Sequence, residues 1–216
     1  TFTAQWKAAA LNLKEATVNV TNSPVEYNGQ AQQAVVEVIN PYTKEALPTN
    51  AYRVSYKLDG VNQSGVPTNA GVYDVMVSPT AAGIEAGLVV SGNQNSLIIE
   101  DAFTISPKRL TKDVITVPET LPDMEATGEQ LKPVFDVRDT ALDQVLTEGT
   151  DYTLAYGANV EPGEGTVTIA GMGNYTDSLT LTFNIVSSKI DIGDTAQVTV
   201  EVQESATYTG SAIEPT

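Results

Sequence analysis

The chain has 216 residues, with 27 acidic and 11 basic side chains, no histidine, no cysteine and a formal net charge of −16. The missing residue types exclude an imidazole general base, a thiolate nucleophile, disulfides and the usual zinc ligands. Strong acidity disfavours a nucleic-acid partner, and no apolar run is long enough for membrane insertion. Hydrophobic residues at 41% and charged residues at 18% are typical of a globular protein.

Residues 1–15 are expected to be the end of a preceding module or a linker. The stretch from Trp6 to Glu15 has a helix-like apolar pattern but no convincing cap, so it is equally compatible with a linker running into a strand. For Trp6, packing beside a module join is a better interpretation than anchoring a ligand. The chain begins without a Met or a leader-like segment, so we expect it to be a piece of a longer protein.

A two-residue periodicity dominates the rest of the chain. Apolar residues alternate with polar ones over 52–58 and 179–185, and the polar face of the first run carries Arg53, Ser55 and Lys57. Proline and glycine separate these runs. Short strands at this regular spacing predict an all-β fold made of antiparallel β-sandwich modules.

The chain also contains an internal repeat. The pattern Tyr-x-x-x-Tyr occurs at 52–56 and 152–156, and Phe-x-Ile occurs at 103–105 and 183–185. The offset falls from 100 at the tyrosines to 80 at the phenylalanines, so the first copy has about 20 extra residues, placed here after Val77. The residues that mark the repeat, with Gly71 matched to Gly165, are Tyr52, Tyr56, Gly71, Phe103, Tyr152, Tyr156, Gly165, Tyr175, Phe183 and Tyr208.

These matches divide the chain into modules. The first repeat is predicted at 16–107, with its insertion at 78–102, and the second repeat at 108–186. Residues 187–216 are interpreted as the truncated start of a third repeat, which is expected to pack on the second repeat or to pair with another chain.

The joins at 106–108 and 186–189 are short. A short link between sandwiches restricts their relative rotation, so the modules are predicted to form an extended rod. The net charge is −4 before residue 108, −8 in the second repeat and −4 after it, so the middle of the rod is the most acidic part.

The order of these motifs resembles the tandem Ig-like repeats of bacterial cell-surface proteins, including the MBG type. In the second copy the residues that carry the resemblance are Gly128, Asp151, Tyr152, Tyr156, Gly165, Gly171, Gly173, Asn174, Tyr175, Phe183 and Ile185. In the third copy they are Tyr208, Thr209, Gly210, Ile213 and Pro215. Residues 2–7 are similar to the closing strand of an internalin-type B repeat.

The resemblance implies an extracellular protein, secreted or attached to a bacterial cell surface or wall, built from spacers and adhesive modules. We therefore expect a non-catalytic structural stalk that projects a distal functional domain, with neighbouring domains of the same chain as its partners. The alternative is an adhesin that binds a host glycan or protein through the insertion in the first repeat. The insertion offers Asn93, Gln94 and Asn95 as candidate ligand-binding residues.

Two groups of residues could form a binding site or could serve only the structure of the fold. The pairs Tyr52/Tyr56 and Tyr152/Tyr156 each share a strand face, as an aromatic binding platform would, but packing inside the sandwich explains them better. Asp136, Asp139 and Asp143, with further acids nearby, are candidates for calcium, the one cofactor considered. Their spacing is not that of a calcium loop, and a solvated turn is the competing interpretation. Asp191 and Asp194 form a weaker case of the same kind.

Catalysis is not expected. Paired carboxylates can hydrolyse glycosides, but the sequence contains no recognisable aromatic-lined groove to hold a sugar. No serine stands on a Gly-x-Ser-x-Gly turn. A Lys–Asn isopeptide bond would need Lys132 and Asn184 buried together, yet Asn184 alternates with Phe183 and is expected to point away from the core.

Overall fold

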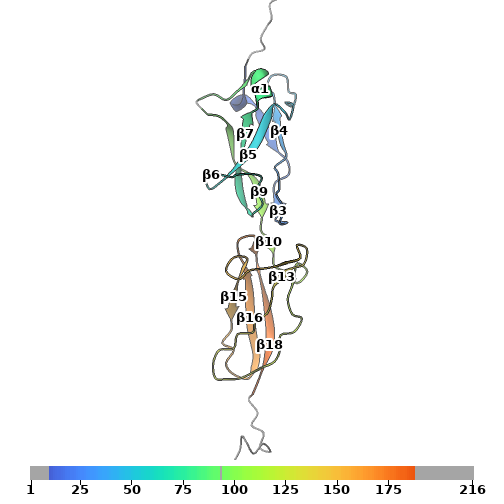
Figure 1. Ribbon diagram of the computed structural model, residues 1–216, viewed down its shortest axis with the longest axis vertical. Coiled ribbons are helices and arrows are strands. Elements are labelled where there is room, and N and C mark those ends of the chain that lie inside the picture. The colour runs from blue at the N-terminus through green and yellow to red at the C-terminus, as the bar shows by residue number, and fades with distance from the viewer. Residues whose placement is uncertain (1–9, 93, 188–216) are drawn as a thin grey trace, which may run out of the picture.

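The computed structural model describes residues 10–92 and 94–187 and confirms the all-β prediction. Among these residues, every strand pairing joins partners within 11–106 or within 108–186. Figure 1 shows the first set of strands followed by the second along the long axis of the molecule, with β10 at the join.

The first set forms a sandwich-like pair of sheets. A two-stranded sheet of β2 and β4 packs on a five-stranded sheet in the order β3-β9-β7-β5-β6, and β1 pairs with β8. The elements are β1 (Leu11–Asn12), the 3-10 helix η1 (Leu13–Glu15), β2 (Thr17–Val20), β3 (Val25–Glu26), β4 (Val36–Ile39), β5 (Tyr52–Leu58), β6 (Val61–Asn62), β7 (Gly71–Pro79), α1 (Ala81–Glu85), β8 (Leu88–Val89) and β9 (Leu97–Ser106).

The alternating residues of β5 explain how the two sheets are held together. Tyr52 and Tyr56 point into the core, where they are 7% and 1% exposed. The Tyr52 hydroxyl donates to the carbonyl of Val36 over 2.9 Å, and the Tyr56 hydroxyl accepts from the N–H of Ala34 over 2.8 Å. A buried tyrosine needs such a partner, so these rings fill the core and also bond to the facing sheet.

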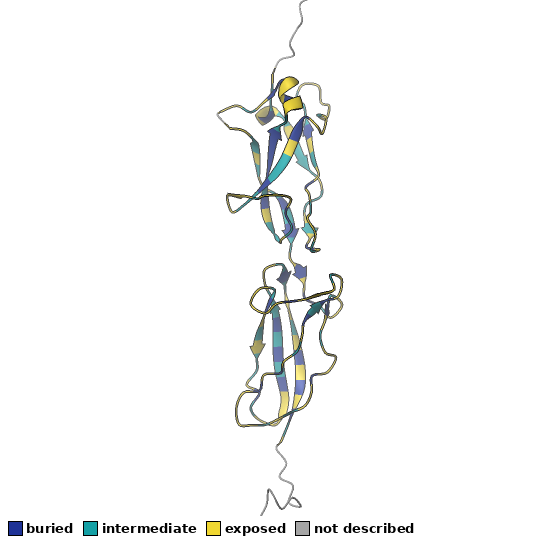
Figure 2. Cartoon of the chain, viewed as in Figure 1, coloured by how far each residue is buried: buried dark blue, intermediate teal, exposed yellow. Residues whose placement is uncertain are grey.

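The second set repeats this arrangement with fewer residues. A three-stranded sheet in the order β11-β13-β14 packs on a four-stranded sheet in the order β12-β18-β16-β15, and β10 pairs with β17. Buried residues alternate with half-buried ones along β16 and with exposed ones along β18 (Figure 2). The elements are β10 (Lys108–Arg109), β11 (Ile115–Thr116), β12 (Met124–Glu125), β13 (Arg138–Asp139), β14 (Gln144–Val145), β15 (Tyr152–Tyr156), β16 (Gly163–Gly171), β17 (Tyr175–Thr176) and β18 (Ser178–Val186).

The long central pairings are antiparallel, as predicted, but short edge pairings are parallel. The described residues pair in parallel at β1–β8, β3–β9, β10–β17 and β12–β18, each over two residues. Parallel ladders are only slightly less stable per residue than antiparallel ones, so such short pairings cost little.

Residues 10–15, which were predicted to belong to a linker or a preceding module, are part of the first set of strands. Leu11–Asn12 pairs with Leu88–Val89, and Leu13 is fully buried. Neither a long helix nor a free linker occurs over residues 10–15, because burial of the leucine side chains holds this segment on the sandwich.

The strand register corrects the predicted match between glycines. Tyr73 lies opposite Phe103, and Gly165 lies opposite Phe183, so Gly165 corresponds to Tyr73 and not to Gly71. A Cβ atom on residue 165 would lie 2.5 Å from the Phe183 ring. The second set therefore needs glycine where the first set fills its core with a tyrosine.

The register also divides the extra residues of the first set between two places. Val54 and Val77 are 23 positions apart, whereas their counterparts Leu154 and Ile169 are 15 apart. Eight extra residues therefore lie between β5 and β7, outside the predicted insertion at 78–102. The remaining twelve lie between Val77 and Phe103, in the segment that contains α1 and β8.

Candidate functional site

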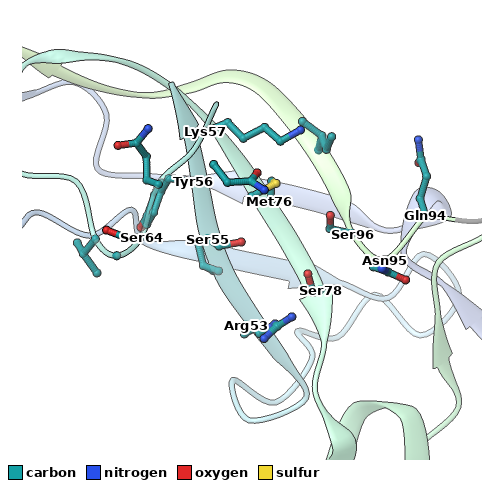
Figure 3. A pocket seen from close by; sticks show the side chains of 16 residues that line it. Arg53, Ser55, Tyr56, Lys57, Ser64, Met76, Ser78, Gln94, Asn95 and Ser96 are labelled. Carbon is teal, nitrogen blue, oxygen red and sulfur yellow. The ribbon is translucent and has the colours of Figure 1, made fainter. Parts of the chain in front are cut away.

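The outer face of the five-stranded sheet carries an open groove with a volume of about 690 Å³. Its floor is formed by strands β5, β7 and β9, and its walls are the segments 62–66 and 94–96 (Figure 3). The side chains of the floor include Arg53, Ser55, Lys57, Met76, Ser78 and Ile98.

Strand alternation places these side chains in the groove. Because Tyr52 and Tyr56 point into the core, Arg53, Ser55 and Lys57 point to the opposite face of the sheet. The register then sets Arg53 beside Ser78, Ser55 beside Met76, and Met76 beside Ile98.

Hydrogen bonds hold one wall against the sheet. The backbone N–H of Gln63 donates to the carbonyl of Tyr56 over 2.9 Å, and its side-chain amide donates to the carbonyl of Val61 over 3.1 Å. The other wall leads directly into β9 and presents exposed amide side chains from Gln94 and Asn95.

The groove differs in charge from the rest of the molecule. Its lining contains Arg53 and Lys57 and, within the described residues, no aspartate or glutamate. Neither cation forms a salt bridge to any residue that the structure describes. Asp74 lies directly opposite Lys57 on the neighbouring strand, and Ser78 lies opposite Arg53. In a chain of net charge −16, the guanidinium of Arg53 is therefore the local positive site of the groove.

The structure brings two of the three predicted ligand-binding residues to this groove. Gln94 and Asn95 line it, and Asn93 lies outside the described residues. The sequence prediction missed the role of Arg53 and Lys57, although the alternation in 52–58 already placed them on the face away from the core. The signal was a pair of basic residues on the outer face of a strand in an acidic chain.

The predicted calcium residues are not brought together. Asp136 is exposed, and Asp143 binds the guanidinium of Arg138 over 2.7 Å at the surface. Within residues 10–92 and 94–187, no group of three or more acidic side chains is placed to hold a metal ion. Asp191 and Asp194 lie outside the described residues.

Asp139 is buried and paired, so the predicted solvated turn is wrong at this position. Its carboxylate is fully buried and lies 2.8 and 2.7 Å from the Nζ atom of Lys108. It also accepts from the Tyr175 hydroxyl over 3.0 Å and from the backbone N–H groups of Ala141 and Leu142 over 2.9 and 3.0 Å. Every strong acceptor position of the carboxylate is therefore used inside the protein.

These contacts shift two pKa values in opposite directions. Burial alone would raise the pKa of Asp139, but the hydrogen bonds from Lys108, Leu142 and Tyr175 outweigh it and hold that pKa below its ordinary value. Burial raises the pKa of Tyr175, and the charge of Asp139 raises it further. Asp139 is thus an ionised structural group, and Tyr175 is a neutral donor to it.

The first set has neutral residues at the same structural positions. Leu11 pairs beside Leu88 as Lys108 pairs beside Tyr175. Asn40 accepts from two following N–H groups, those of Tyr42 and Thr43, as Asp139 does in the second set. The turn is therefore common to both sets, and the buried ion pair is an addition in the second.

The two sets of strands also touch each other across Pro107. The side chain of Asn174 accepts from the N–H of Ala70 over 2.7 Å and donates to the side-chain oxygen of Asn69 over 3.2 Å. The rings of Tyr27 and Tyr175 meet edge to face with centroids 5.7 Å apart. Tyr175 thus contacts the first set with its ring and Asp139 with its hydroxyl.

Most of the remaining candidate residues have structural contacts. Tyr152 and Phe183 are buried, and Phe103 packs among Tyr56 and Tyr73. These rings are not available as a binding platform. Gly71 begins β7.

Other predicted positions are separated or not described. Asn184 is exposed and bonds weakly to Asp123 over 3.4 Å, while the Nζ atom of Lys132 lies 5.7 Å above the Tyr156 ring. The isopeptide candidates are thus engaged with different partners. Trp6 and Tyr208 lie outside the described residues.

No protein-family model and no curated protein matches the chain. The described residues contain no helix with the length and hydrophobicity that crossing a membrane requires. Function must therefore be argued from the join between the two sets of strands and from the groove.

Proposed function

We propose that the chain is a non-catalytic structural spacer made of tandem Ig-like repeats of the MBG type. In this proposal it is a stalk segment of a large bacterial surface or secreted protein, and it projects a distal functional domain away from the cell. Its partners are neighbouring domains of the same chain.

The observation that carries the proposal is the bonded join at Pro107. A single residue separates β9 from β10, and the contacts of Asn174 and Tyr175 with the first set restrict bending there. A spacer needs such restricted joins because freely jointed modules collapse toward a coil and lose reach. The fixed join therefore supports an extended rod.

Two further observations support this function. Both sets have the same kinds of strand pairing around the core, as tandem repeats should. In each set the first strand forms a short parallel pair, β1 with β8 and β10 with β17. The acidic surface, most acidic in the second set, favours solubility and repulsion between neighbouring stalks.

The join can be tested by residual dipolar couplings and small-angle X-ray scattering on the whole chain. We expect both sets of strands to share one alignment tensor and to scatter as an elongated pair. A Gly-Ser insertion after Pro107 should uncouple the tensors, whereas the same insertion between Glu161 and Pro162, in an exposed loop, should leave them coupled. Independent alignment of the two sets in the unmodified chain would contradict the stalk proposal.

A second function is favoured by the groove. Gln94 and Asn95, from the predicted insertion, line the open groove on the first set. This supports the alternative that the first repeat is an adhesin module, and a stalk can carry such a module. Deleting residues 91–96 and measuring adhesion to mucin or matrix separates the two, since a pure spacer should adhere no less without them.

A further inference from the structure

We propose that the groove on the outer face of β5, β7 and β9 binds a carboxylated sugar, with the guanidinium of Arg53 as the carboxylate-binding group. The proposal deepens the adhesin alternative and rests on it. The hydroxyl and amide side chains of the lining bind the sugar hydroxyls.

The guanidinium of Arg53 is complementary in charge to a carboxylate. Arg53 is exposed, lines the groove and has no ion-pair partner among the residues that the structure describes. A planar guanidinium binds a carboxylate through two parallel hydrogen bonds, which gives geometry as well as affinity. Asp74 lies directly across the strands from Lys57, whereas Ser78 lies across from Arg53, so Arg53 is the cation of the groove that has no acid facing it in the register.

Half of the residues that line the groove carry hydroxyl or amide groups, which suit the many donors and acceptors of a sugar ring. The residues with such groups are Ser55, Asn62, Gln63, Ser64, Ser78, Gln94, Asn95 and Ser96. The one aromatic residue in the lining, Tyr56, is 1% exposed, so binding here relies on polar and ionic contacts more than on stacking.

Within residues 108–186, the second set of strands lacks the groove and its charge. The positions of Arg53 and Ser55 are taken by Thr153 and Ala155 in the second set, although the core tyrosines beside them are retained. Both walls of the groove belong to segments in which the first set has extra residues. The second set folds without these walls and without this charge, so neither is required to build the sandwich.

The test is an amide-NMR titration of the whole chain with 3′-sialyllactose, a hyaluronan tetrasaccharide, lactose and a glutamate-rich peptide. We expect either acidic sugar to shift the resonances of Arg53, Ser64 and Ser96 at millimolar concentration, and lactose to leave them unchanged. Arg53→Thr should weaken binding about tenfold, since the lost contact is a charge-assisted hydrogen-bond pair. Lys44→Asn is the matched control, because it removes one positive charge from the same module at an exposed position whose φ of 64° suits asparagine.

Each outcome decides between the proposals. Binding of sialyllactose alone or of the uronic-acid sugar alone supports the site and identifies the source of the carboxylate. Equal binding of lactose would overturn the role of charge while leaving an adhesin that binds neutral sugars. Stronger groove shifts with the peptide would overturn the sugar assignment. No groove shift with any probe would overturn the carboxylated-sugar site, whereas the adhesin alternative would fall only if deletion of residues 91–96 left adhesion to mucin and matrix unchanged.

Discussion

The buried pair between Lys108 and Asp139 yields the sharpest prediction about stability. The substitution Asp139→Asn keeps the shape of the side chain and removes its charge. The retained Oδ1 atom can still accept from the N–H groups of Ala141 and Leu142, as Asn40 does in the corresponding turn. The new NH₂ group, however, replaces the oxygen that accepts from Lys108 over 2.7 Å and from Tyr175, so Lys108 keeps its contact with Oδ1 over 2.8 Å but loses its negatively charged partner.

The burial of the pair sets the expected loss of unfolding free energy. The side chains of Lys108 and Asp139 are 9% and 0% exposed, so an unpaired ammonium would remain almost completely out of water. Removing one partner of a buried pair costs about 3–5 kcal/mol, and we expect Asp139→Asn to lower the free energy of unfolding of the second set by about this amount. The first set indicates how to reverse the loss, because it has Leu11 and Asn40 at these positions.

The double variant Lys108→Leu with Asp139→Asn should therefore unfold within about 1 kcal/mol of the unmodified chain. Urea unfolding followed by the amide resonances of Val167 and Ile169, which are fully buried in the second set, measures the relevant transition. Asp143→Asn is the matched control, because it breaks an ion pair whose aspartate side chain is 90% exposed, and it should cost less than about 1 kcal/mol.

Two results would refute this reasoning. If Asp139→Asn costs no more than Asp143→Asn, the buried carboxylate contributes nothing beyond a surface charge. If the double variant is as unstable as the single one, the loss does not arise from an unpaired ammonium, and the two sets do not share an equivalent turn.

The other predictions concern pH and two packing positions. Because the pKa of Asp139 is lowered from its ordinary 3.8, its contribution to stability is complete above that value and is lost as the pH falls through the folded pKa. The free energy of unfolding of the second set should therefore fall less steeply with decreasing pH in the double variant. Equal slopes in the two proteins would contradict this prediction. Gly165→Ala should cost about 1–3 kcal/mol by crowding Phe183, measured by calorimetry, and Phe183→Leu in the same chain should recover part of it. Tyr56→Phe should cost about 1–3 kcal/mol because the buried N–H of Ala34 loses its acceptor, and an unchanged urea midpoint would show that water replaces the hydroxyl.

The fold class could be predicted from the sequence because strand faces depend on local alternation. The run over 52–58 predicts a buried aromatic face and a polar face, and the structure places Tyr56 and Arg53 accordingly. Alternation does not show which residues of two strands lie opposite each other. The predicted place of some of the extra residues and the predicted match of Gly71 with Gly165 were therefore wrong. Only the register opposite Phe183 resolves that match.

The sequence predicted residues of only one wall of the candidate groove. Gln94 and Asn95 were singled out because they stand in an insertion, and the segment 62–66 that forms the opposite wall carried no comparable signal. The two segments come together because each adjoins the same face of the sheet. A site of this kind depends on which strands are neighbours, and sequence periodicity contains no such information.

By itself, the sequence determined the all-β class, the residues that face the core and the exclusion of histidine and cysteine chemistry, since these depend on composition and local periodicity. The tertiary structure decided what the acidic residues do. Asp139 was one of 27 acids in the sequence, and it became a buried partner of Lys108 because the packing of β10 against β13, which belong to different sheets, brings residues 31 positions apart within 2.8 Å. Likewise, Arg53 and Lys57 were two polar residues of an alternating run until strand order and loop length placed them in one groove. Long-range neighbours decide whether a charge is solvated, paired or presented to a ligand.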